Sequence, residues 1–156
     1  MYLDLSAAIA PVAAAMRHRI IDVRRWALSQ GRPVDADVVA LILAGKMSWR
    51  DEPPDRWTRV GVYGNLYADV PNLCSAHGEL RPISQPEVLW TYLSYLHETT
   101  QFDPGSDPLR ELRKPLRCYG GLGPDGFKAT ENTPRVKCVC KVPYRRRPAR
   151  RQSEAG

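Results

Sequence analysis

A chain of 156 residues normally forms one domain with its own core. No apolar run reaches the roughly 18 residues that a membrane helix requires, so a membrane-embedded protein is not expected. Four cysteines are too few for a disulfide scaffold of this length, and the apolar N-terminal stretch contains Asp4 and lacks the basic segment of a secretory signal. We therefore expect a cytoplasmic protein.

The positive charge is concentrated near the C-terminus. The whole chain has 23 Lys and Arg against 17 Asp and Glu, a formal net charge of +6, but residues 1–140 hold 17 basic and 16 acidic residues. The basic residues that follow are Lys141, Arg145, Arg146, Arg147, Arg150 and Arg151. Such a run beside a proline cannot bury a core, so the sequence predicts a basic flexible tail over 144–156. The tail would attract nucleic-acid phosphates, or would only increase solubility.

Two helices are predicted in the first 50 residues. Over 11–29, Pro11 suits a first helical turn and apolar residues recur every three or four positions. Asp35 is a suitable N-cap for a second helix, which Gly45 would end. The arginines expected on the solvated face of the first helix are Arg17, Arg24 and Arg25. Two helices joined by a short turn indicate an αα-hairpin or the opening of a helix-turn-helix motif.

The segment 56–70 supports two interpretations, which stay open. As a β-hairpin, Gly64-Asn65 would be the turn between arms rich in Val and Tyr. As a helix, it would carry Gly61 and Gly64 at a cost of about 1 kcal/mol each relative to alanine. The residues that would share the apolar face of that helix are Trp57, Val60, Tyr63, Tyr67 and Val70. The helix would present Thr58, Arg59 and Asn65 as DNA-recognition residues.

The clearest helix is predicted over 84–99. Ser84 and Glu87 have the spacing of a capping box, and a buried stripe of Leu and Tyr follows them. A second, shorter helix is expected to open after Asp107-Pro108 and to end at Pro115, whose ring cannot continue the hydrogen-bond ladder.

Alternation of Val and Cys predicts a closing strand over 135–142. The predicted fold class is therefore α+β: a helix-rich single domain with a small C-terminal β element and a basic disordered tail. This domain would span 1–143, with a helical part over 1–50 and a cysteine-containing part over 56–143.

The cysteines suggest a structural zinc site as one alternative. The four thiols considered as ligands are Cys74, Cys118, Cys138 and Cys140, with His77 as a substitute. Zinc takes four tetrahedral ligands, commonly thiolates and imidazoles. The opposing interpretation is that these cysteines are small buried apolar residues, because no paired CxxC motif is present.

No catalytic residue is predicted, and we expect a non-enzymatic protein. The loop GGLGPDGFKAT resembles a phosphate-binding loop, but Phe127 separates Gly126 from Lys128, so the pattern fails. The pair Cys74 and His77 lacks a recognisable third group to orient the histidine.

Three segments carry a resemblance to other proteins. DVPNLC, LRKPLRCYGGL and the CxC motif followed by PYR are similar to segments of uncharacterised small proteins of high-GC actinobacteria and their phages or mobile elements. The resemblance covers about the last two-thirds of the chain. It implies a regulatory or phage-type protein and assigns no activity to any residue.

The function expected from the sequence is that of a non-enzymatic DNA-associated regulatory protein. The N-terminal helices would dock, the 56–70 segment would contact DNA, and the basic tail would add non-specific affinity. The alternative is a protein-binding module that modulates a host or cellular machine. A salt titration of DNA binding separates the two, because contacts to phosphate weaken steeply as salt rises.

Overall fold

The structure, a computed structural model, describes residues 4–133, and its regular elements are helices. They are α1 (Leu5–Ala15), α2 (Arg17–Ser29), α3 (Ala36–Ala44), the π-helix η1 (Gly45–Trp49), α4 (Arg59–Gly64), the π-helix η2 (Asn65–Asp69), α5 (Val70–Ala76), α6 (Gln85–Glu98) and α7 (Leu109–Cys118). Over these residues no strand forms, and one isolated antiparallel bridge joins Leu122 to Lys128. The predicted α+β class is therefore wrong, and the described part of the protein is all-α. The strand predicted over 135–142 lies outside the described residues.

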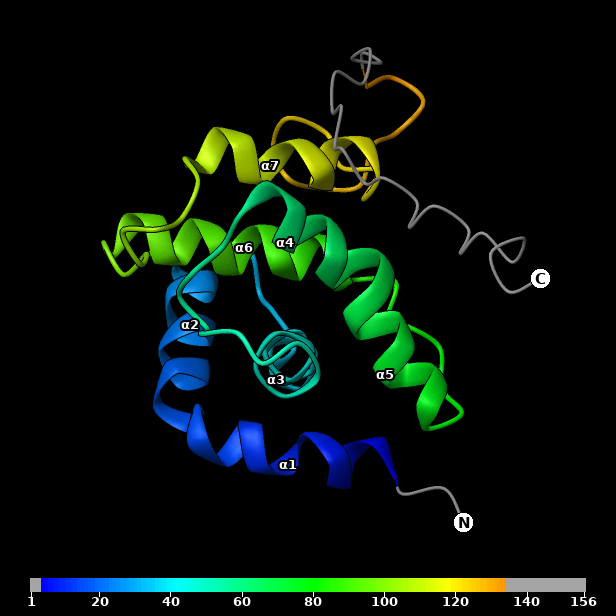
Figure 1. Ribbon diagram of the computed structural model, residues 1–156. Helices are drawn as coiled ribbons and strands as arrows, with labels where there is room; N and C mark the ends of the chain where they lie inside the picture. The colour runs from blue at the N-terminus through cyan, green and yellow to red at the C-terminus, as the bar shows by residue number, and fades with distance from the viewer. Residues whose placement is uncertain (1–3, 134–156) are drawn as a thin grey trace, which may run out of the picture.

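Helix α3 lies at the centre of the molecule. Viewed along its axis, it is surrounded by α1, α2, α6 and the α4–α5 helix (Figure 1). Every residue of Val38–Ala44 is buried, which follows from a sequence that is apolar on all sides. Asp35 caps this helix as predicted, since its side chain accepts a hydrogen bond from the backbone N–H of Asp37 at 2.8 Å.

The predicted single helix over 11–29 is two helices. Asp4 caps α1, which therefore begins well before Pro11 and contains that proline in its interior. The chain bends at Met16, whose φ of −106° and ψ of 16° are not helical, and α2 begins at the next residue. Three of the four arginines of α2 are exposed as predicted, Arg17, Arg24 and Arg25, whereas Arg19 is half-buried and pairs with Asp55.

Gly45 does not end the second predicted helix. It has helical dihedral angles, and the chain continues from α3 into η1. The glycine allows close packing here, because a Cβ at this position would lie only 3.0 Å from Cγ2 of Val70.

The segment after Thr58 is helical from Arg59 to Ala76, through α4, η2 and α5, so the hairpin interpretation of 56–70 is wrong. The apolar face differs from the predicted one. Val62, Leu66 and Val70 are fully buried, whereas Val60 and Tyr67 are exposed. The π-helical turn of η2 changes the register of the face midway, which a constant helical period does not anticipate.

Helices α6 and α7 pack together and close the core on one side (Figure 1). The helix predicted over 84–99 is confirmed, but its capping box is not: the Ser84 side chain makes no cap hydrogen bond, and Glu87 instead accepts one from the backbone N–H of Lys128. Pro115 does not end α7, which continues to Cys118. Among the helices of residues 4–133, none is both long and apolar enough to cross a membrane.

Candidate functional site

Three tyrosines meet at the surface where η2 approaches the end of α7. The ring centroids of Tyr63 and Tyr67 are 5.0 Å apart, and the ring of Tyr119 lies 4.8 and 5.6 Å from them. The Tyr67 hydroxyl donates a hydrogen bond to the Tyr119 carbonyl at 2.6 Å. We call these residues the tyrosine cluster. Its rings pack against one another at the distances of favourable aromatic pairs, so it offers a grouped aromatic surface.

A second exposed apolar feature lies in the connection between α5 and α6. Leu80 is 93% exposed and Ile83 is 87% exposed, the highest values among the exposed large hydrophobic residues of the described chain. We call residues 80–83 the Leu80 loop. Single exposed apolar side chains are ordinary on protein surfaces, but two in one short loop beside exposed aromatic rings form a patch that requires an explanation.

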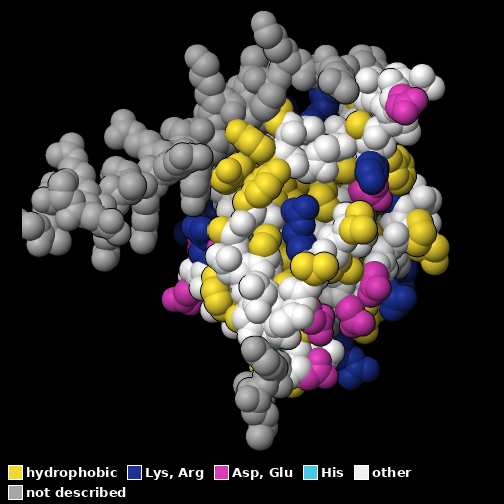
Figure 2. Space-filling view, turned by 90° about the vertical axis from the view of Figure 1, so that its right-hand side faces the viewer, with side chains coloured by type: hydrophobic (Ala, Val, Ile, Leu, Met, Phe, Trp, Pro, Cys, Tyr) yellow, Lys and Arg dark blue, Asp and Glu magenta, His cyan; other side chains and the backbone are white. Residues whose placement is uncertain are grey.

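Arg81 joins these two features. Its Nη1 donates to the carbonyl oxygen of Leu66 at 2.9 Å, which fixes the Leu80 loop against η2. Burial raises the pKa of Tyr67, and the nearby Arg81 charge opposes that rise, so the guanidinium lies beside the tyrosine cluster. Figure 2 shows hydrophobic side chains gathered on the face that includes α5 and the chain that follows it, with basic side chains among them.

A cavity of about 470 Å³ opens beside the Leu80 loop. Its walls come from the loop, the first turn of α6 and the segment that follows α7. The side chains and residues that matter for its chemistry are Arg81, Ile83, Pro86, Glu87, Leu122 and Lys128. We call this cavity the α6 pocket. Its volume is in the range of pockets that hold small molecules or peptide side chains.

The helix residues predicted to contact DNA make hydrogen bonds or an ion pair with other residues of the fold. The Thr58 side chain caps α4 by accepting a hydrogen bond from the Gly61 N–H at 3.0 Å. The backbone N–H of Arg59 donates to Asp107 at 2.8 Å, and its side chain lies 3.4 Å from Glu111. Asn65 is fully buried. Asn65 is therefore not available at the surface, whereas Thr58 and Arg59 are half-buried and DNA recognition by them stays a prediction.

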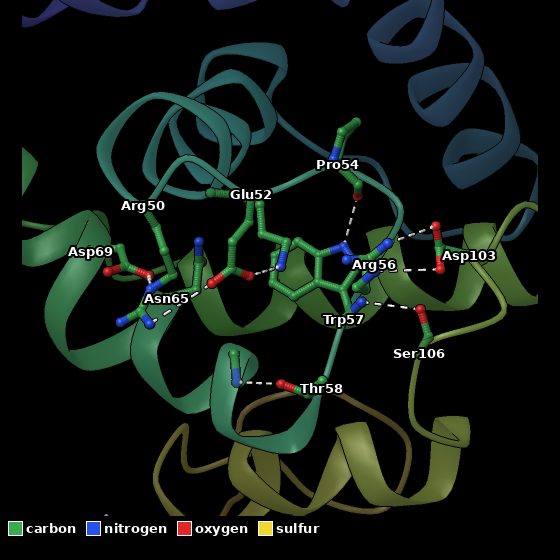
Figure 3. Close-up of polar contacts among 12 residues, drawn as sticks. Arg50, Glu52, Pro54, Arg56, Trp57, Thr58, Asn65, Asp69, Asp103 and Ser106 are labelled. Carbon is green, nitrogen blue, oxygen red and sulfur yellow. Dashed lines mark hydrogen bonds and ion pairs between the residues drawn. The ribbon is translucent and has the colours of Figure 1, made fainter.

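Figure 3 shows how the segment before α4 is tied to the rest of the molecule. Arg50 reaches Asp69 at 2.9 Å, and the backbone N–H of Trp57 donates to Ser106 at 3.0 Å. Lys46, which is 2% exposed, pairs with Glu52 at 2.7 Å and lies 4.4 Å from the centre of the Trp57 ring. The acidic segment 51–55 thus supplies ion-pair partners for cations, Glu52 for the buried Lys46 and Asp55 for the half-buried Arg19.

Most basic side chains of the described residues form ion pairs or hydrogen bonds within the fold. Helix α7 carries four basic residues along one of its faces. They are Arg110, Arg113, Lys114 and Arg117, which recur at helical spacing. The guanidinium of Arg113 lies 4.4 Å from the centre of the Trp90 ring, and Lys114 pairs with Glu111 at 2.7 Å. Arg110 is exposed. The predicted phosphate-binding tail residues Arg145, Arg146, Arg147, Arg150 and Arg151 lie outside the described residues.

The predicted zinc ligands are only partly described. Cys74 is a fully buried free thiol in α5, and burial raises its pKa, with Glu79 adding to the rise and Arg81 opposing it. A raised pKa disfavours the thiolate that zinc binds. Cys118 is half-buried at the end of α7, and His77 follows the end of α5.

Among residues 4–133, no three His, Cys, Asp or Glu side chains are grouped so as to hold a metal ion. Cys138 and Cys140 lie outside the described residues. The four-thiolate zinc site therefore stays a prediction.

Neither the tyrosine cluster nor the Leu80 loop was predicted from the sequence. Tyr67 and Tyr119 are 52 residues apart, so only the packing of α4 against α7 reveals their contact. The Leu80 loop does carry a local signal: two large apolar residues flank Arg-Pro in a connection between helices. Comparison of the chain with protein-family models, with curated proteins and with solved structures gave no significant match.

Proposed function

We propose that this protein is a non-enzymatic protein-binding module, and that its partner docks on the face formed by the tyrosine cluster and the Leu80 loop. The observation that carries the proposal is the near-complete exposure of Leu80 and Ile83 in a loop that Arg81 joins to Leu66, the residue before Tyr67 of the tyrosine cluster. Tyrosine and arginine are enriched at the centres of protein interfaces, and Arg81 lies between the two apolar groups.

The charge of the described body agrees with this proposal. Residues 4–133 contain 15 Lys and Arg against 16 Asp and Glu, a formal charge of −1, and most of the basic side chains are tied to carboxylates or carbonyls. A nearly neutral body gives little long-range attraction to a polyanion, whereas its apolar face is suited to another protein.

The proposal is tested with the double variant Leu80→Asp/Ile83→Asp. Because both side chains are almost fully exposed, the free energy of unfolding should change by no more than about 0.5 kcal/mol. Partner binding should weaken by at least about 2 kcal/mol, since carboxylates would replace apolar contacts at the centre of the interface. The partner is first captured with a photo-cross-linking residue placed at position 80, and its affinity for both proteins is then measured by calorimetry.

A photo-cross-linking residue at the position of Arg24, on exposed α2, is the matched control. Helix α2 lies apart from α7 in Figure 1, so a partner docked on the proposed face should not react there. A partner that cross-links equally at both positions, or that binds the double variant as tightly as the wild type, would contradict the proposal.

Nucleic-acid association is the second candidate function, and the basic face of α7 favours it. If that face and the C-terminal basic segment contact phosphates, affinity for duplex DNA should fall steeply with salt. The variant Arg110→Glu/Lys114→Glu should then lower the slope of log affinity against log salt by about 2, one for each phosphate that the variant no longer neutralises. Fluorescence anisotropy with a duplex of arbitrary sequence measures the slope.

The variant Arg24→Glu/Arg25→Glu is the charge-matched control for this measurement, because these arginines are exposed on α2, away from α7. Equal slopes for the two variants would remove α7 from nucleic-acid binding. Affinity that does not change with salt in the wild type would remove the function altogether.

A further inference from the structure

The walls of the α6 pocket carry more basic than acidic side chains. Its walls carry the basic side chains of Arg81 and Lys128 and the carboxylate of Glu87. Within residues 4–133, no carboxylate forms an ion pair with either basic side chain, and the hydrogen bond of Arg81 goes to a neutral carbonyl oxygen.

Glu87 does not cancel this excess. One of its oxygens accepts the backbone N–H of Lys128 at 2.9 Å, and the carboxylate also lies near the guanidinium of Arg32. Its charge is therefore partly offset by a backbone donor of the pocket wall and by Arg32, which does not line the pocket. The first turn of the 14-residue helix α6 forms one wall, and the partial positive charge of that helix end adds to the excess.

The remaining walls are apolar. Ile83, Pro86 and Leu122 line the cavity, and Ile83 also belongs to the exposed Leu80 loop. On the other side, the Gly120–Gly121 wall directly follows Tyr119 of the tyrosine cluster. The pocket is thus continuous with the proposed docking face, and a ligand that fills it would also contact that face.

We infer that the α6 pocket receives an acidic, apolar peptide segment of the partner: a large apolar side chain enters between Ile83, Pro86 and Leu122, and a neighbouring Asp or Glu pairs with Arg81 or Lys128. Two cations with no carboxylate partner in the described chain favour an anionic ligand, and the apolar walls favour a hydrocarbon side chain beside it. An extended peptide supplies both and spans the pocket and the tyrosine cluster together. This inference rests on the proposed function and adds the chemistry of the partner.

The test is a selection of random short peptides against the full-length protein. Peptides that bind should be enriched in Asp and Glu next to Leu, Ile, Met, Phe or Trp. A synthetic copy of the most enriched peptide should bind the variant Arg81→Glu/Lys128→Glu at least about tenfold more weakly, because like charges would then face each other. The variant Arg24→Glu/Arg25→Glu, with the same change in net charge on α2, should bind the peptide as the wild type does.

The milder pair Arg81→Gln and Lys128→Gln guards against loss of folding, since neither introduces a repulsive charge, and each should also weaken the peptide. Recovery of peptides without acidic enrichment, recovery of no peptide above background, or binding unaffected by these changes would overturn the inference. Duplex DNA binding that is lost in the same variants would assign the two cations to phosphate and would also overturn it.

Different results would contradict the proposed docking face and the pocket inference. Peptides that depend on Leu80 and Ile83 but ignore Arg81 and Lys128 would overturn the pocket inference and leave the docking face in place. Peptides that depend on the two cations but bind the Leu80→Asp/Ile83→Asp variant normally would support the pocket and contradict the proposed docking face.

Discussion

Replacing Trp57 by alanine is expected to lower the free energy of unfolding by about 4 kcal/mol. The Trp57 side chain is fully buried, packs edge-on against Tyr92 with ring centroids 6.2 Å apart, and carries the ammonium of Lys46 over its face. Its Nε1 donates to the Pro54 carbonyl at 2.8 Å. The alanine variant would leave a large cavity and would release the linker before α4 from the core. Urea unfolding followed by far-ultraviolet circular dichroism measures the loss.

Trp49 provides the matched control, since it is 48% exposed. Trp49→Ala should change the free energy of unfolding by no more than about 0.5 kcal/mol. Similar losses for the two variants would show that the core does not depend on Trp57 in the way its contacts indicate.

Replacing Asn65 by aspartate is expected to cost roughly 3 kcal/mol at neutral pH. The Asn65 amide nitrogen donates to the Ile42 carbonyl at 3.1 Å, and its side-chain oxygen accepts from Gln85 Nε2 at 3.0 Å. An aspartate carboxylate would place a buried negative charge against the Ile42 carbonyl, with no donor between them. Unfolding titrations at several pH values, each referred to the wild type at the same pH, measure the loss.

The pH dependence of this loss has a definite sign. Burial raises the pKa of a carboxyl group in the folded state above its unfolded value, which is about 3.9 for aspartate. The penalty relative to the wild type should therefore be smallest below about pH 4 and should grow as pH rises towards the folded pKa. Asn72, which is exposed on α5, is the control, and Asn72→Asp should show little loss at any pH. An Asn65→Asp variant as stable as the wild type would contradict the buried position of this residue.

Helices with a strong apolar pattern can be predicted from the sequence alone. Seven consecutive apolar residues after Asp37 leave few alternatives to a buried helix, and α6 follows from an apolar stripe of strong helical period. The start of α3 and the extent of α6 are confirmed to within one or two residues.

The segment 56–70 cannot be decided locally, because its glycines serve tertiary packing. A Cβ at Gly61 would lie 3.1 Å from the Thr58 hydroxyl, and one at Gly64 would lie 3.0 Å from the Arg50 guanidinium. Judged by local conformational propensity alone, these glycines favour a turn or lower the stability of a helix. The structure leaves little room for a Cβ at either position, and at Gly64 the neighbouring side chain, Arg50, lies outside the segment.

The candidate site is less predictable than the fold for a similar reason. A polar residue such as Asn65 is expected at the surface, yet its amide satisfies polar groups of α3 and α6. The tyrosine cluster depends on α4 meeting α7, and the α6 pocket depends on residues near 83, 87, 122 and 128 coming together. None of these juxtapositions follows from spacing in the sequence.

The central position of α3 has a consequence for how the chain acquires its structure. The segment Val38–Ala44 leaves the ribosome long before α6, one of the helices that cover it, has been synthesised. Until then, seven adjacent apolar side chains stay partly exposed to solvent, and such a stretch is a site for self-association or for chaperone binding. Complete folding of the domain therefore requires α6 from the second half of the chain, because α1 and α2 alone contact only part of α3.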